Sequence, residues 1–118
     1  MKRVADFPKV FIYREFADMR KQIAGLSAMI EAAMGLSPFE PALFVFVNKR
    51  RDLMKALYWD LSGFAMWVKR LDEEKFAWPK KIPDKVLAIT PQQMEWLLEG
   101  YNIWQMKRHK GLQLKHVS

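Results

Sequence analysis

Residues 42–79 read ALFVFVNKRRDLMKALYWDLSGFAMWVKRLDEEKFAWP, and this stretch decides the fold that we predict for the chain. It contains three apolar runs, at residues 43–47, 53–59 and 64–68, and each run ends in a polar or turn-forming patch. Val, Phe, Tyr and Trp at this density favour a pleated, half-buried surface. Short runs separated by Asn, Asp, Ser and Gly are typical of a hairpin meander. We therefore predict a three-stranded antiparallel sheet, with residues 76–78 as a candidate fourth strand.

The two faces of this sheet follow from the alternation of side chains along each strand. In the middle strand, one face carries Leu53, Lys55, Leu57 and Trp59, and the other carries Met54, Ala56, Tyr58 and Asp60. Neither face is purely polar. We expect a helix to cover one face and the other to lie partly open, with long Lys and Arg stems resting over aromatic rings.

The flanking segments add further elements. We expect an edge strand at Lys9–Tyr13, then a helix that Asp18 caps and Gly35 ends, because apolar residues recur there at three- and four-residue steps. A short strand is expected at Val86–Ile89, followed by a helix with Thr90 at its cap and proline at its first position. The predicted fold class is therefore α+β, with a mainly antiparallel sheet of about four to six strands and two helices.

Length and composition limit the class of protein. A chain of 118 residues, of which 51% are hydrophobic, corresponds to one domain with a real core. We assign that domain to residues 1–104 and a basic tail to residues 105–118. The chain contains no cysteine, which removes disulfides, thiolate zinc sites and cysteine nucleophiles. Since no stretch resembles a membrane span or a signal peptide, we expect a soluble, cytoplasmic protein without a membrane partner.

The net charge of +7 is unevenly distributed. Residues 41–85 carry ten Lys or Arg against six Asp or Glu, whereas residues 1–40 carry six against five. A basic surface of this size suits a polyanion, with nucleic acid as the leading candidate. Plain solubility remains an equally good explanation, because small domains commonly carry a net charge of roughly 2–8.

The predicted loop at residues 48–52 carries three consecutive cations, which repel one another unless water or an anion surrounds them. It is either a solubilising turn that discourages aggregation or a phosphate-gripping finger. The candidate DNA-binding set combines this loop with cations of the sheet and the tail: Lys49, Arg50, Arg51, Lys55, Lys69, Arg70, Lys107, Arg108 and Lys110.

The acidic and imidazole side chains do not suggest catalysis. Asp18 and Asp60 have capping and turn roles, and three consecutive acids at residues 72–74 cannot all point inward from one turn. His109 and His116 lie in the tail without a neighbouring acid or cysteine in ligand spacing. We therefore predict no catalytic residue, no metal site and no cofactor.

The five tryptophans belong mostly to the core, as bulky residues of a small sheet–helix domain usually do. One or two of them, exposed on the sheet beside Lys55, Lys69 or Arg70, could instead stack on unpaired bases.

Several segments, in this order and spacing, resemble one known family. They are DMRKQIAGL at residues 18–26, LFVFVNKRRDLMKALYWD at residues 43–60, Gly63, KRLD at residues 69–72, FAWP at residues 76–79 and ITPQQMEWLLEG at residues 89–100. Together they look like the TnpB-type accessory protein of the sixty-six class (IS-66 family) of bacterial insertion sequences. The resemblance implies a protein encoded by a mobile element beside a transposase and another small accessory protein. It carries over no catalytic residues.

These observations lead to one functional prediction and one alternative. The chain is expected to be a non-enzymatic accessory factor for transposition that binds DNA through phosphate contacts, which position a protein without reading sequence. Its expected partners are DNA, the transposase and the other element-encoded accessory protein. In the alternative, the chain docks on the transposase and does not contact DNA directly. The sequence does not fix the oligomeric state.

Overall fold

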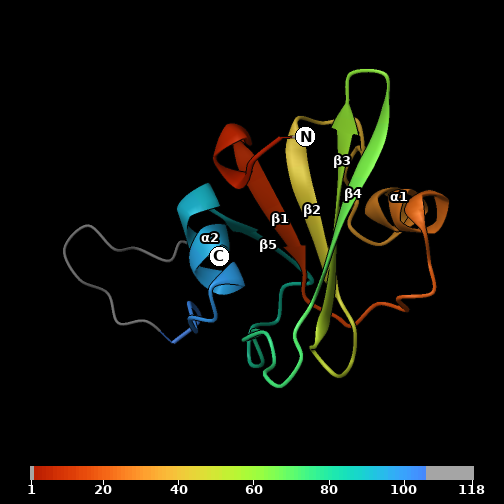
Figure 1. Cartoon of the computed structure of the whole chain (residues 1–118). Helices are drawn as coiled ribbons and strands as arrows, with labels where there is room; N and C mark the ends of the chain where they lie inside the picture. The colour runs from red at the N-terminus through yellow and green to blue at the C-terminus, as the bar shows by residue number, and fades with distance from the viewer. Residues whose placement is uncertain (1, 106–118) are drawn as a thin grey trace.

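The computed structural model describes residues 2–105, and these residues form an α+β fold, as predicted. Figure 1 shows the arrangement of its elements. In chain order they are the 3-10 helix η1 (Val4–Asp6), β1 (Lys9–Tyr13), α1 (Ile23–Ala32), β2 (Ala42–Val47), β3 (Leu53–Asp60), β4 (Gly63–Arg70), β5 (Val86–Ile89) and α2 (Pro91–Leu98). Of the predicted tail at residues 105–118, all but Gln105 lies outside the described residues.

The five strands of the described chain form one mixed sheet in the order β4-β3-β2-β1-β5. Neighbouring strands are antiparallel except β1 and β2, which are parallel and are connected through α1. The prediction that Lys9–Tyr13 forms an edge strand is therefore wrong. β1 lies between β2 and β5, because the crossover through α1 returns the chain to the inner side of β1 and β5 then pairs with its other side.

The predicted meander is present with the expected turns. The loop of residues 48–52 connects β2 to β3, and a tight turn connects β3 to β4, with Asp60 paired to Gly63 at one end and Leu53 to Arg70 at the other. Residues 76–78, in contrast, do not form a strand. The side chains of Phe76 and Trp78 are buried in the core instead.

One face of the sheet packs against α1, in a core that includes Leu26, Ile30, Phe44 and Leu57. The helix starts later than predicted, at Ile23 rather than near Asp18. The carboxylate of Asp18 accepts hydrogen bonds from the backbone N–H and the guanidinium of Arg20, so it stabilises a local turn.

The buried side chain of Lys55 contacts the segment that precedes α1. Its ammonium group donates hydrogen bonds to the carbonyl oxygens of Met19 (2.8 Å) and Lys21 (2.9 Å). These carbonyls would be among the first acceptors of a helix that began at Asp18. The segment before Ile23 lies outside the helix, and Lys55 satisfies two of its backbone acceptors.

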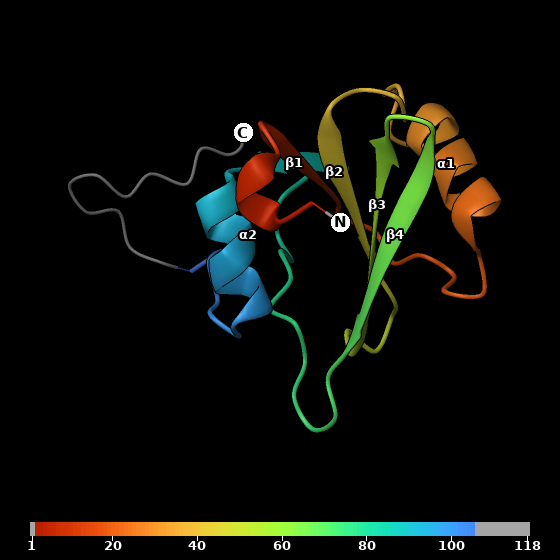
Figure 2. The same cartoon turned by 45° about the horizontal axis from the view of Figure 1, so that its top comes forward.

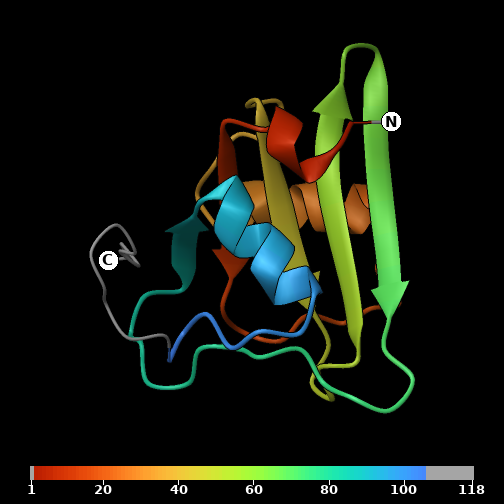
Figure 3. The ribbon, with the colours of Figure 1, turned by 60° about the vertical axis from the view of Figure 1, so that its left-hand side comes forward.

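The opposite face of the sheet is also covered over β1, β2 and β3, but it stays partly open along β4, where Ala65 and Trp67 are only partly buried. η1, α2 and the segment of residues 76–78 pack over it and enclose Val10, Tyr58 and Met94. Figure 2 shows α1 on one side of the sheet and η1 with α2 on the other, and Figure 3 shows α2 and η1 in front of the strands.

The N-terminus of α2 confirms the prediction made from its sequence. The hydroxyl of Thr90 accepts a hydrogen bond from the Gln93 backbone N–H at 3.0 Å, and the Gln93 side chain accepts one from the Thr90 N–H at 2.8 Å. Pro91 occupies the first helical position, where a missing N–H costs nothing.

Candidate nucleic-acid interface

The loop of residues 48–52, which we call the hairpin tip, is built around the side chain of Asn48. The Asn48 amide oxygen accepts hydrogen bonds from the backbone N–H groups of Asp52 and Leu53, both at 3.1 Å. Its amide nitrogen donates to the Asp52 carboxylate at 2.7 Å. One side chain therefore closes the loop from within, and Lys49 and Arg50 are left exposed at its end.

The base of the hairpin tip is joined to the segment that follows β4. The Phe76 N–H donates to the Arg51 carbonyl at 2.7 Å, and the Leu71 N–H donates to the Asp52 carbonyl at 2.8 Å. Arg51 has a φ of 61°, an uncommon conformation for a residue other than glycine. Because the carbonyls of Arg51 and Asp52 both accept hydrogen bonds, the backbone of this turn is held in place and sets the direction in which the Arg51 side chain starts.

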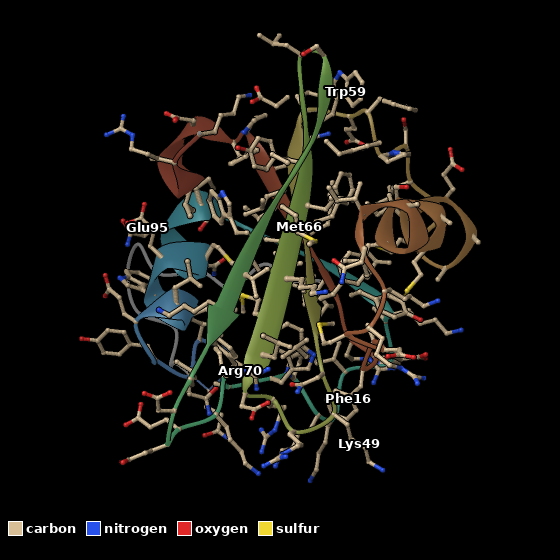
Figure 4. All side chains as sticks on the ribbon, turned by 45° about the vertical axis from the view of Figure 1, so that its right-hand side comes forward. Phe16, Lys49, Trp59, Met66, Arg70 and Glu95 are labelled. Atoms are coloured by element: carbon tan, nitrogen blue, oxygen red, sulfur yellow. The ribbon has the colours of Figure 1, made fainter. Side chains whose placement is uncertain are left out.

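Four of the predicted cations lie at this end of the sheet. They are Lys49, Arg50 and Arg51 of the hairpin tip and Arg70 at the end of β4, and together we call them the hairpin-tip surface. Figure 4 shows Lys49 and Arg70 toward the end of the sheet opposite Trp59. Arg70 forms an ion pair of 3.7 Å with Asp52 and remains 60% exposed, so only part of its charge is compensated.

The electrostatics of the hairpin tip are visible in the Asp52 carboxyl. The hydrogen bond from the Asn48 amide lowers the pKa of Asp52, and the nearby positive charges of Arg50 and Arg70 lower it further. Asp52 is therefore a carboxylate at neutral pH and cancels one charge of the surface. Within residues 2–105, Lys49, Arg50 and Arg51 form no ion pair.

Two predicted cations do not belong to this surface. Lys55 is only 5% exposed and its ammonium is hydrogen-bonded to two backbone carbonyls, so the prediction that it contacts phosphates is wrong. Lys69 lies on the other face of β4, where its ammonium donates to the Leu98 carbonyl at the C-terminus of α2. A cation at that position is favoured by the helix dipole. The remaining three, Lys107, Arg108 and Lys110, lie outside the described residues, as do His109 and His116.

The sequence reasoning missed a second group of residues beside the hairpin tip. Two adjoining hollows, of about 380 and 490 Å³, share the residues Arg51, Trp78, Pro79 and Lys80. The smaller also reaches Lys81 and Trp104, and the larger reaches Arg14 and Phe16. The adjacent lysines after Trp78 and Pro79 were the available signal, but their approach to residue 51 depends on the tertiary fold.

The tryptophans mostly have structural roles, as expected. Trp67, Trp78, Trp96 and Trp104 pack against the core on the α2 side of the sheet. Trp59 instead contacts the ring of Phe39 edge-on, with ring centroids 5.0 Å apart, at the far end of the sheet from the hairpin tip.

Metal and membrane sites find no support in the described part of the chain. Residues 2–105 contain no group of three or more His, Asp or Glu side chains arranged to hold a metal ion. Over the same residues, no helix has the length and apolar character required to span a bilayer.

The fold and this surface define a small α+β protein with a basic loop at one end of its sheet. A family model described as "IS66 Orf2 like protein" matches residues 8–108, and the chain belongs to that family. This confirms the resemblance drawn from its segments, and it associates the chain with the transposition of an insertion sequence in an accessory role.

Two relatives from Sinorhizobium fredii match along most of their length. One, named "Uncharacterized protein y4hO", is 33% identical over 92 residues, which cover 78% of this chain and 79% of the relative. The other, "Uncharacterized protein y4jC", is 30% identical over 100 residues, or 85% of each chain. No solved structure matches the chain significantly.

Proposed function

We propose that this protein is a non-enzymatic accessory factor of transposition that binds DNA directly through the hairpin-tip surface. The observation that carries the proposal is the exposure of Lys49 and Arg50, without an acidic partner among residues 2–105, on a loop fixed by Asn48. A loop held in one conformation loses little entropy when its side chains bind phosphates. Arg50 and Arg51 add planar guanidinium groups that match phosphate oxygens in pairs.

The proposal is tested by removing two charges from this surface and two from elsewhere. In the test variant, Lys49→Ala and Arg50→Ala are combined. In the control, Arg3→Ala and Lys9→Ala are combined, which changes the net charge equally. Lys9 pairs with Ala42 at the start of β2, whereas the hairpin tip follows the end of β2. Arg3 and Lys9 are both exposed, and their surface ion pairs contribute little to stability.

Binding is measured by the anisotropy of a labelled duplex that carries an end of the insertion sequence. Each lost phosphate contact should weaken affinity by about eightfold at about 0.1 M salt, from the counterion slope of roughly 0.9 per phosphate. We expect a large loss for the test variant and wild-type affinity for the control. Equal affinities for the two variants would refute the hairpin-tip surface as the contact.

A second function, docking on the transposase without DNA contact, is favoured by the other end of the sheet. There Phe39 is 55% exposed and Leu61 is 90% exposed, beside the edge-on pair of Phe39 and Trp59. Under this alternative, the combined variant Phe39→Ala and Leu61→Ala loses capture of the purified transposase. The Lys49 and Arg50 variant should then retain it, and the protein alone should not bind duplex DNA.

A further inference from the structure

The smaller hollow beside the hairpin tip is formed where distant segments of the chain converge. The Phe76 N–H donates to the Arg51 carbonyl at 2.7 Å, which joins the hairpin tip to the segment of residues 76–82. The Trp104 indole N–H donates to the Ala77 carbonyl at 3.0 Å, which adds the end of the described chain. The first hydrogen bond joins two backbone groups and the second is donated by the Trp104 side chain, so together they hold the three segments in contact around the hollow.

The larger hollow continues from the smaller one past Trp78. The Trp78 indole N–H donates to the Arg14 carbonyl at 2.9 Å, and the Ala17 N–H donates to the Val47 carbonyl at 2.9 Å. The segment that carries Phe16 is thereby attached to the end of β2, immediately before the hairpin tip. Figures 1 and 3 agree that the loops after β2 and β4 lie at this end of the sheet.

The aromatic rings here have fixed orientations. Trp78 is 5% exposed and forms part of the floor, and its indole edge is hydrogen-bonded. Trp104 is half-buried and is also held by its indole N–H. Phe16 is 49% exposed and shares the larger hollow with three cations, Arg14, Arg51 and Lys80. The rings at either end of the joined hollows are therefore partly open to solvent.

Positive charge dominates the lining. Arg51, Lys80 and Lys81 form no ion pair with any residue between 2 and 105. Among residues 2–105, the one acid of the lining is Glu15, which lies 3.9 Å from the Lys85 ammonium, so its charge is already partly compensated. The joined hollows thus present cations and ring surfaces together.

We propose that these joined hollows bind an unpaired DNA strand, with phosphates at Arg51, Lys80 and Lys81 and bases against Phe16 and Trp104. The proposal deepens the proposed function, on which it rests, by adding a single-strand site beside the duplex-binding surface. A positively charged groove with aromatic stacking surfaces is the general arrangement of proteins that bind single strands without sequence preference. The volume of each hollow falls in the range that accommodates small ligands of nucleotide size.

An unpaired strand fits these features better than a duplex does. Base faces are hidden in a duplex and only the base edges are accessible in its grooves. Exposed ring surfaces such as Phe16 gain little from a duplex but can stack on a base that has left its pair. An acidic peptide could also form ion pairs with these cations, but it has no bases to stack on the ring of Phe16. This difference allows the two occupants to be distinguished.

The test uses the full chain and three labelled probes of about 12 units each, which is within the usual site size. The first is a thymidine strand, the second is the same backbone without bases, and the third is polyglutamate. Binding of each probe is measured for wild type, for Phe16→Ala and for the combined variant Lys80→Ala and Lys81→Ala. Phe39→Ala is the matched control, since Phe39 is similarly exposed, at 55%, and contacts Trp59 at the far end of the sheet. Duplex binding is recorded in parallel.

We expect Phe16→Ala to weaken binding of the thymidine strand by about fivefold or more, since stacking on one base contributes about that factor. The same variant should leave the base-free strand unchanged. The double lysine variant should weaken both strands, and Phe39→Ala neither. Retention of duplex affinity by the Phe16 and lysine variants would place the single-strand site apart from the hairpin-tip surface.

The proposal is overturned if the thymidine strand fails to bind, if Phe16→Ala and the double lysine variant leave its affinity unchanged, or if polyglutamate binds equally well. Duplex binding that persists in any of these cases leaves the proposed function standing. If wild type does not bind the duplex but does bind the thymidine strand, the proposed function is refuted and the single-strand site is not.

Discussion

Replacing Lys55 by methionine removes the ammonium group that occupies the Met19 and Lys21 carbonyls and keeps most of the apolar stem. Both hydrogen bonds are charge-assisted, and each such bond contributes about 1.5–3 kcal/mol. Removal of the buried charge also removes its desolvation cost, which offsets part of that loss. We therefore expect the free energy of unfolding to fall by about 2–4 kcal/mol, a net figure below the sum of the two bonds.

The assay is urea denaturation followed by circular dichroism. Lys49→Met is the matched control, because the same substitution on an exposed lysine should change stability by about 0.5 kcal/mol or less. Amide hydrogen exchange at residues 18–23 provides a second measurement, in which the Lys55 variant should lose local protection. A Lys55→Met protein as stable as wild type, with unchanged exchange there, would refute the assigned role of this lysine in holding the segment that precedes α1.

Three further predictions concern the elements that support the candidate surface. Thr90→Ala should lower the free energy of unfolding by about 1 kcal/mol in urea denaturation, because α2 loses its capping box, whereas an unchanged value would contradict the cap. Leu57→Ala should cost about 2–5 kcal/mol by the same measurement, since its side chain is fully buried between the sheet and α1, and a loss below about 1 kcal/mol would contradict that packing. Asp52→Asn should be less stable than wild type at neutral pH, and this difference should narrow as the pH falls below about 4. The reason is that a carboxyl group with a lowered pKa stabilises the fold above its unfolded pKa, and this stability is lost as the pH falls through the folded pKa. A stability difference that stays constant between about pH 6 and 2 would contradict the assigned state of Asp52.

Local patterns in the sequence were enough to predict the meander and the second helix. The alternation along β3 correctly placed Leu57 and Tyr58 on opposite faces, because period-two patterning depends only on neighbouring residues. The Thr90 cap was likewise found, since its hydrogen bonds join residues three positions apart. These features follow from backbone geometry within a few residues.

Features that depend on contacts between distant residues could not be predicted. The place of β1 inside the sheet depends on the crossover through α1, which neither strand reveals alone. Lys55 resembles an exposed sheet cation in the sequence, and only the packing of residues 19–21 over it shows that it is buried. The approach of Lys80 to Arg51 is also tertiary, because their segments are joined through the Phe76 hydrogen bond.

The same distinction applies to the candidate surface. Lys49, Arg50 and Arg51 are adjacent in sequence, so their proximity was predictable, and Arg70 joins them through the pairing of β3 with β4. Which of these four cations has an acidic partner could not be predicted from the sequence. Asp52 meets Arg70 because the Asn48 side chain orients the loop, whereas the tip cations are left without an ion pair among residues 2–105.

The salt dependence of duplex binding tests the central claim most directly, because it counts the phosphates that the protein neutralises. Anisotropy titrations at several salt concentrations, on a duplex from an insertion-sequence end, give the slope of log affinity against log salt. The slope for the Lys49→Ala and Arg50→Ala variant should be shallower than the wild-type slope by about 2, corresponding to two lost phosphate contacts. The Arg3→Ala and Lys9→Ala control should keep the wild-type slope. Parallel slopes for all three proteins would contradict the assignment of the hairpin tip as the DNA contact.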